Sequence, residues 1–122
     1  MREINTAEAP AAIGPYSQAI LAGNTLYISG QIALRNGVLE GNTEQQTRIA
    51  LSNIGAILNE AGFGFENVVK TTVLLKNMSD FAQMNQVYAE FFKRPFPARA
   101  AFEVGALPKG ALVEIEAIAV KD

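Results

Sequence analysis

Apolar residues recur every three or four positions between Thr43 and Ala61, and this spacing predicts a helix. The residues that would share its apolar face are Ile49, Ile54, Ile57, Leu58 and Ala61. Thr43 and Gln46 have the spacing of a capping box at its start, and Gly62 is typical of the residue that follows a helix. We interpret the apolar face as one that packs on a core, without chemistry of its own.

A second helical pattern begins between Asn77 and Asp80 and ends at about Phe92. Its apolar stripe consists of Phe81, Met84, Tyr88 and Phe91. Pro95 and Pro97 follow and would stop the helix, because proline cannot continue the backbone hydrogen bonding. This stripe, too, is most simply a surface that faces the core.

Shorter apolar segments alternate with polar residues in the way that strands do. Residues 16–22 and 25–29 flank Gly23-Asn24, which is a signal for a β-hairpin, and residues 68–75 form another strand-like run. The weaker features are a strand at residues 2–6, an irregular segment at residues 7–15 and a turn at Asn36-Gly37.

Two apolar, partly β-branched stretches, residues 96–104 and 112–120, enclose a turn at residues 107–110 and predict a C-terminal hairpin. Alternation along the second stretch puts Glu114 and Glu116 on one face. The other face of that stretch would carry Val113, Ile115, Ala117 and Ala119.

Arg99 lies in the first of these stretches between alanines, and it shares a face with Ala101 and Glu103. A charge inside an otherwise apolar strand needs a partner, because an unpaired buried charge is costly. One interpretation is a glutamate that pairs with Arg99 and ties the strands together. The other is an external carboxylate that binds there. From these residues alone, the ion pair is favoured.

The elements follow one another as strand, hairpin, helix, strand, helix and hairpin, within a single domain of residues 1–122. Helices that link strands of one sheet make right-handed crossovers, so we expect an α+β fold with a mixed sheet and both helices on one face. The other face would stay uncovered, although it carries apolar strand residues. Such a face usually marks an interface, and we therefore expect oligomerisation through it.

Composition excludes several function classes. The net charge is −2 and the ten lysines and arginines are scattered, which does not fit a nucleic-acid-binding stripe. The chain has no cysteine and no histidine, so thiolate catalysis, a Ser-His-Asp triad and the usual zinc sites are excluded. Because no signal-peptide pattern or membrane-length apolar run occurs, we expect a cytoplasmic protein that binds no membrane.

Several short motifs lie along the chain in a fixed order. They are residues 9–19, Ser29-Gly30-Gln31-Ile32, Val69-Lys70-Thr71-Thr72-Val73, Asn85 with Tyr88, Pro97-Ala98-Arg99, Leu107-Pro108-Lys109 and Glu114-Ile115-Glu116-Ala117-Ile118-Ala119. Together they cover essentially the whole chain, and their order is far more specific than any one of them alone. On these residues the sequence resembles the RidA family (reactive intermediate deaminase A, also called YjgF).

This resemblance implies a chorismate-mutase-like α+β fold that assembles as a homotrimer, with clefts between subunits. It also implies hydrolysis of reactive enamines and imines, such as the 2-aminoacrylate formed by pyridoxal-phosphate-dependent dehydratases, to 2-keto acids and ammonia. No metal or organic cofactor would be needed. The partners would be a small carboxylate substrate and further copies of the chain, with no nucleic acid and no membrane.

The resemblance also implies roles for individual residues. Arg99 matches the ligand of the substrate carboxylate, and Glu114 matches the acid that orients the attacking water. The residues that match the substrate-binding positions are Tyr16, Ser29, Gly30, Asn85, Arg99 and Ala101. Many bacterial members have Ser-Cys after the arginine, where this chain has Ala100-Ala101, so only backbone groups could contact a substrate at position 101.

The residue chemistry is consistent with these roles and also with plainer ones. Arg99 offers a planar fork for a carboxylate, and Glu114 could take a proton from water and return one to ammonia. Alternatively, the two form a structural ion pair in the empty site. Ser29 and Asn85 could simply satisfy backbone groups at the ends of elements, and Tyr16 could be an amphipathic strand residue.

Three functions therefore compete: an imine deaminase, a non-catalytic trimeric module that binds keto or amino acids through Arg99, and a protein that acts on nucleic acid, as claimed for some members of the family. The acidic charge balance counts against the third function. Glu114 separates the first two, because a binding module needs Arg99 but has no need of an acid.

Overall fold

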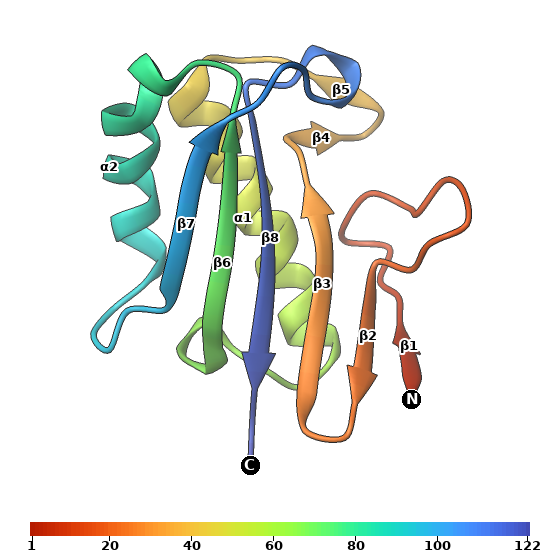
Figure 1. The fold of residues 1–122 in the computed structure, drawn as a ribbon. Helices are drawn as coiled ribbons and strands as arrows, with labels where there is room; N and C mark the ends of the chain where they lie inside the picture. Colours follow the sequence, from red (N-terminus) through yellow and green to blue (C-terminus); the bar gives the residue numbers. More distant parts are fainter.

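The computed structural model describes all 122 residues, which form one main sheet with two α-helices on one of its faces (Figure 1). The sheet has six strands in the spatial order β1 (Arg2–Ile4), β2 (Ala19–Ala22), β3 (Thr25–Gln31), β8 (Val113–Val120), β6 (Val68–Leu75) and β7 (Ala98–Glu103). Neighbouring strands are antiparallel except β6 and β7, which run parallel. The predicted α+β fold with a mixed sheet is confirmed.

The helices are α1 (Thr43–Glu60) and α2 (Phe81–Phe91). Figure 1 shows α1 crossing behind the centre of the sheet, with α2 beside β7. The short elements are β4 (Leu34–Arg35), β5 (Val38–Leu39) and three 3₁₀ turns, η1 (Phe65–Asn67), η2 (Met78–Asp80) and η3 (Pro108–Gly110). Neither helix combines the length and apolar character that crossing a membrane requires.

The capping box predicted on Thr43 and Gln46 lies one residue earlier. The Asn42 side chain accepts the backbone N–H of Gln45 at 2.9 Å, and the Gln45 side chain accepts the backbone N–H of Asn42 at 2.8 Å. Gln46 instead turns inward and is buried, and its side-chain oxygen accepts the backbone N–H of Leu112 at 2.9 Å. This contact connects α1 to the start of β8. Its two residues are far apart along the chain, so the local spacing of residues could not predict it.

The predicted C-terminal hairpin is wrong. β7 pairs with β6, where Arg99 lies opposite Thr71, whereas β8 pairs with β3 and β6 and has no pairing with β7. The crossover through α2 returns the chain parallel to β6 and directly beside it, as consecutive elements of a sheet usually lie. The chain then passes the end of β6, where Val104 donates to the carbonyl of Leu75 at 2.9 Å, and enters the centre of the sheet as β8. The apolar face of β8 is thereby covered by α1.

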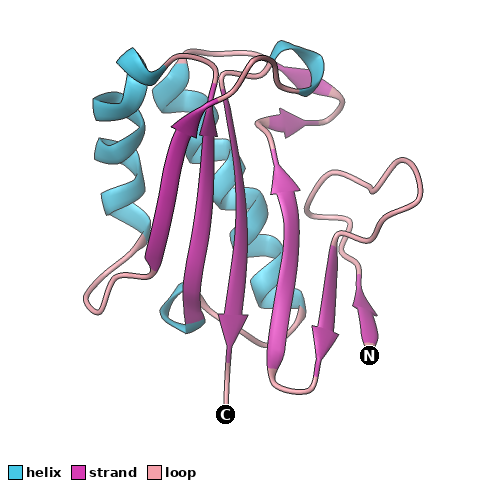
Figure 2. Cartoon of the chain, in the orientation of Figure 1, coloured by secondary structure: helices cyan, strands magenta, loops and turns pink.

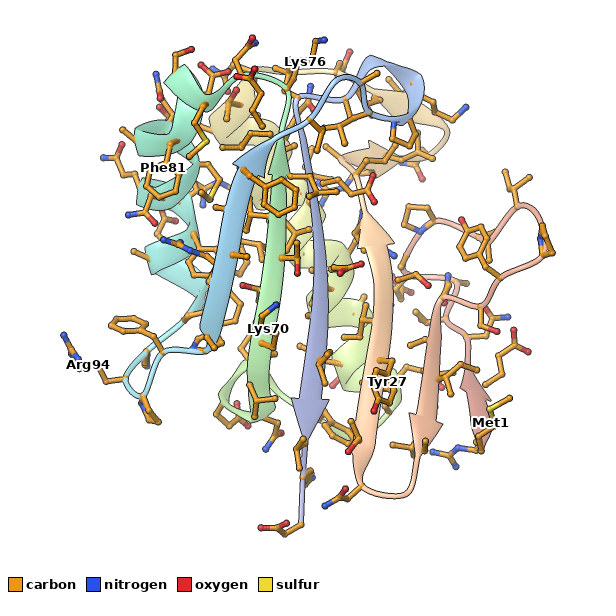
Figure 3. All side chains as sticks on the ribbon, in the orientation of Figure 1. Met1, Tyr27, Lys70, Lys76, Phe81 and Arg94 are labelled. Carbon is orange, nitrogen blue, oxygen red and sulfur yellow. The ribbon has the colours of Figure 1, made fainter.

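The two faces of the sheet differ in what covers them. The helix side holds the core, which includes the buried residues Val73, Leu75, Val113, Ile115, Ala117 and Ala119. On the opposite face, Tyr27 is 50% exposed and Phe102 is 48% exposed. Figure 3 shows Tyr27 and Lys70 on this face, in front of the sheet and away from α1. The uncovered, partly apolar face expected from the sequence is therefore present.

Candidate functional site

A cleft of about 640 Å³ opens beside the uncovered face of the sheet. Its walls come from the long loop between β1 and β2, the end of β3, the η3 turn and the start of β8, and Figure 2 shows the β1–β2 loop in pink and the η3 turn in cyan. The predicted site residues that line it are Tyr16, Ser29, Gly30 and Glu114. We call these four residues the glutamate cleft.

One buried side chain holds the loop wall in place. The side-chain amide of Gln18 donates to the carbonyls of Thr6 at 3.1 Å and Pro10 at 2.8 Å, and its oxygen accepts the backbone N–H of Thr6 at 2.8 Å. These bonds keep Gln18 in the loop. The strand β2 therefore begins at Ala19, whereas the hairpin pattern predicted a start at Tyr16. The tyrosine is left 53% exposed at the cleft.

Ser29 contributes to the same arrangement. Its hydroxyl donates to the carbonyl of Ser17 at 2.6 Å, and its backbone N–H donates to the carbonyl of Gln18 at 2.9 Å. The hydroxyl hydrogen is therefore used to hold the loop. What Ser29 offers a ligand is the acceptor capacity of its oxygen.

Gly30 provides space for Glu114. A Cβ atom built on Gly30 would overlap the carboxylate of Glu114, and its backbone does not lie in the left-handed region that favours glycine. The absence of a side chain is therefore needed for the position of the carboxylate and not for the backbone conformation. A glycine at the end of a strand is expected to allow another group to approach the backbone closely, and the Glu114 side chain does so at Gly30.

Glu114 is half-buried in the wall of the cleft. Burial raises the pKa of its carboxyl above the usual value, and the nearby charge of Glu116 adds to the increase. A carboxyl that holds its proton to higher pH is better matched to proton transfer near neutrality than a fully solvated one. The structure records no hydrogen bond or salt bridge from another side chain to Glu114.

Arg99 lies elsewhere. Its Nη1 donates to the side-chain oxygen of Asn85 at 2.7 Å, and its guanidinium carbon lies 4.7 Å from the ring centre of Tyr88 and 5.4 Å from that of Phe81. Both rings and the amide belong to α2, so the Arg99 side chain points to the helix side of the sheet. Ala101 follows on the same face of β7 and packs against the core. We call Arg99, Asn85 and Ala101 the arginine edge, because β7 is the last strand of the sheet.

The ion pair favoured from the sequence, between Arg99 and a glutamate, is wrong within the chain. The single salt bridge joins Arg48 and Glu90 on the two helices. β6 separates Arg99 on β7 from Glu114 on β8, which puts the two strands about 10 Å apart. Alternation then turns Arg99 toward the helices and Glu114 toward the uncovered face. One small ligand cannot contact both residues in the same chain.

Sequence reasoning missed the contacts of two aromatic residues. Phe81 and Tyr88 were interpreted only as core residues, yet both rings also lie against the guanidinium of Arg99. The available signal was the spacing of Phe81, Asn85 and Tyr88, which puts all three on one face of a helix. Lys109 was missed as well, and it lines the cleft from the η3 turn with a φ of 56°. The residues form no cluster of three or more His, Cys, Asp or Glu that could hold a metal ion.

Comparisons with known proteins extend over nearly the whole chain. The family model described as Endoribonuclease L-PSP matches residues 6–121. A human protein named 2-iminobutanoate/2-iminopropanoate deaminase is 52% identical over 98% of this chain and 90% of its own length. The structure of RidA from an Antarctic Psychrobacter bacterium has a TM-score of 0.96 at 45% identity and covers 99% of this chain and 100% of that one.

A third similar protein was solved with a ligand. The structure of TdcF from E. coli with bound serine has a TM-score of 0.95 at 38% identity, and each chain is covered completely, at 100%. The similarity to these proteins therefore holds in both sequence and structure, and it covers the motifs and the helices and strands that contain them. This chain belongs to the RidA (YjgF) family.

Proposed function

We propose that this protein is a 2-iminobutanoate/2-iminopropanoate deaminase, which hydrolyses reactive 2-imino and 2-enamino acids to 2-keto acids and ammonia. Mammalian relatives at 50–54% identity carry that name. The observation that carries the proposal is Glu114, a half-buried carboxyl with a raised pKa that lines a cleft. A protein that only binds a carboxylate has no need of such a group.

The proposed chemistry divides between the two parts of the site. Arg99 holds the substrate carboxylate through N–H groups other than the Nη1 bond to Asn85. A water molecule attacks the imine carbon, and Glu114 accepts a proton from it as the C–O bond forms. That proton passes to the nitrogen, which gives a carbinolamine. The carbinolamine hydroxyl then gives up its proton as the C=O bond forms, the amino group gains a proton, the C–N bond breaks, and ammonia departs from the 2-keto acid. The bound serine in the TdcF structure, an amino acid with a carboxylate, supports a ligand of this class.

We propose that the two parts of the site come from different copies of the chain. Within one chain they lie on opposite faces of the sheet, so we propose that the arginine edge of one subunit completes the glutamate cleft of the next. A homotrimer of about 39 kDa, three times the 13.1 kDa chain, would use the uncovered apolar face in this way. Light scattering on a sizing column measures the assembly. A stable monomer at micromolar concentration would contradict both the trimer and the shared site.

The runner-up is a non-catalytic module that binds keto or amino acids through Arg99. Such a module would explain the arginine edge, but it would not explain why the buried position of Glu114 raises the pKa of this carboxyl. A nuclease function, which the description of the matched family model suggests, is not favoured by a cleft that contains Glu114 and Glu116 in a chain of net charge −2. Incubation with labelled RNA tests it, and we expect no cleavage.

The deciding experiment couples the protein to a dehydratase that makes 2-aminoacrylate and follows the release of keto acid. We expect release well above the spontaneous rate, and we expect prolonged treatment with a chelator to leave it unchanged. Keto-acid binding without any acceleration would favour the binding module. The cytoplasmic location expected from the sequence stays a prediction.

A further inference from the structure

Three residues of α2 meet the Arg99 side chain from one side. Phe81, Asn85 and Tyr88 are spaced by four and three positions, which puts them on one helix face. Asn85 accepts the Nη1 hydrogen at 2.7 Å, while the two rings lie 5.4 Å and 4.7 Å from the guanidinium carbon. Figure 3 labels Phe81 on this helix, facing the sheet edge. The arginine is exposed, yet three different groups restrict its side chain.

Tyr88, the nearer ring, is itself held. It is only 5% exposed, and its hydroxyl shares a hydrogen bond of 2.8 Å with the hydroxyl of Thr71. Thr71 lies directly opposite Arg99 in the pairing of β6 with β7. The three residues therefore form a closed arrangement: the strands align Thr71 with Arg99, Thr71 fixes the tyrosine, and the tyrosine ring supports the guanidinium. Burial also raises the pKa of Tyr88, which keeps the ring a neutral phenol.

We propose that Tyr88 and Thr71 are positioning residues, which orient Arg99 so that its free N–H groups form a ready fork for the substrate carboxylate. This proposal rests on the proposed function for the identity of the ligand. An arginine on an edge strand has many rotamers, and a side chain that is already ordered loses less freedom when it binds. Neither residue contacts the substrate in this arrangement, so both act through Arg99.

The alternative is that Tyr88 and Thr71 only fill the core. Both roles predict some loss of stability on substitution, so melting temperature cannot separate them. The positioning role alone predicts that the loss appears in carboxylate binding and depends on the presence of Arg99. It also predicts that KM rises more than kcat falls, because the arginine holds the substrate in the ground state as well as in the transition state.

The first experiment measures the affinity for 2-oxobutanoate by calorimetry, together with KM and kcat. Tyr88→Phe and Thr71→Val keep the shape but lose the hydroxyl bond, and we expect each to weaken binding about threefold. Tyr88→Leu also loses the ring under the cation, and we expect roughly tenfold weaker binding. Added to Arg99→Ala, the leucine substitution should weaken binding no further, because the interaction that it removes is already gone.

Two matched controls separate positioning from packing. Phe91→Leu removes another aromatic ring of α2, which packs on Phe65 and not on Arg99. Thr47→Val removes a buried hydroxyl that donates to the carbonyl of Thr43 within α1 and makes no bond to Arg99, Tyr88 or Thr71. We expect both to lower the melting temperature while affinity stays unchanged. Equal weakening by these controls, or full affinity in Tyr88→Leu, would overturn the proposal.

A second readout does not depend on the proposed function. The Nε–Hε signal of Arg99 in the NMR spectrum of the ligand-free protein, assigned by its loss in Arg99→Lys, reports the order of the side chain. We expect a sharp, dispersed signal in the wild type and an averaged one in Tyr88→Leu. If the wild type binds no keto acid, the proposed function fails, and this signal still decides whether Tyr88 positions the arginine. An unchanged signal in Tyr88→Leu would refute the positioning role.

Discussion

The glutamate cleft and the arginine edge are built in contrasting ways. Around Glu114 the walls are mainly loops and turns, and no side chain bonds to the carboxyl group. Around Arg99, by contrast, an edge strand and a helix supply an amide and two aromatic rings that hold the guanidinium. The carboxyl is left free to gain and lose a proton, whereas the arginine is fixed.

This contrast matches two different tasks. Carboxylate binding depends on fixed geometry, because a bidentate fork loses affinity when it tilts. Proton transfer depends on a group whose pKa is shifted and which has room to exchange partners, as Glu114 has beside Gly30. Under the proposed function, one chain would carry a binding half and a proton-transfer half, and would present them to different neighbouring subunits. The five predictions below test this separation.

Glu114→Gln should have the largest effect. It keeps the shape of the side chain but removes the proton acceptor, and we expect hydrolysis to fall by about 10²–10⁴-fold while 2-oxobutanoate still binds. The coupled assay and calorimetry measure the two quantities. Glu3→Gln, at an exposed glutamate of β1, is the control and should leave both unchanged. Full turnover in Glu114→Gln would remove this residue from the mechanism.

Arg99→Lys should affect both binding and turnover. The charge remains but the planar fork and the Asn85 contact are altered, so we expect kcat/KM to fall by roughly 10²-fold or more and the affinity for keto acid to fall with it. A kinetic series over substrate concentrations below and above KM, together with calorimetry on 2-oxobutanoate, measures these two quantities. Retained affinity in Arg99→Lys would show that another group holds the carboxylate.

Mixed assemblies test whether the two halves come from different chains. When Arg99→Lys and Glu114→Gln chains are co-expressed, the whole random pool should regain about a quarter of wild-type activity and purified mixed trimers about a third, because one of the three sites is intact in every mixed trimer. Tagged purification of the mixed species and the coupled assay measure the recovery. Each variant expressed alone serves as the control. No recovery would mean that both residues act from the same chain.

Gly30→Ala should separate catalysis from folding. The added methyl group overlaps the Glu114 carboxylate, but the backbone of Gly30 is one that alanine adopts without strain. The carboxylate is the end of a flexible side chain and can move aside, so we expect near-native melting and roughly tenfold slower hydrolysis, at the low end of what a misplaced catalytic group costs. Gly23→Ala, in the β2–β3 turn with a φ of +61°, is the contrasting control, which should lose stability and keep turnover. Wild-type activity in Gly30→Ala would show that the position of Glu114 is not critical.

The smallest effect concerns stability and pH. The folded protein holds the Glu114 proton more tightly than the unfolded chain, so this residue favours folding at low pH, and the contribution is lost as pH rises from about 4.5 through the raised pKa. At neutral pH, Glu114→Gln should therefore melt about 1–2 °C above the wild type, a shift kept small by solvent screening. The gap should close as pH falls below 4.5. A lower melting temperature in Glu114→Gln at neutral pH would indicate that Glu114 forms a stabilising ion pair with Arg99 of another chain.

Much of the fold could be predicted because its signals are local. The apolar faces of α1 and α2 follow from spacing, and the β2–β3 hairpin follows from Gly23-Asn24. The C-terminal hairpin could not be predicted correctly, because β7 and β8 carry apolar patterns that fit several partners equally well. The same limit applies to the site. Local pattern identified Arg99 as an unusual charge in a strand and favoured its pairing with a glutamate, whereas Glu114 was singled out only by the family resemblance.

By itself, the sequence determined the α+β class, the family and the two charged residues on which the proposed chemistry depends, since each is expressed in short-range periodicity or in motifs read in order. Only the tertiary structure decided that β6 lies between β7 and β8, so that Arg99 and Glu114 face opposite sides of the sheet. Strand order is set by long-range packing of the β8 apolar face under α1 and by the return of the α2 crossover beside β6. Neither the packing of β8 under α1 nor the path of the α2 crossover can be predicted from the residue pattern of a single segment.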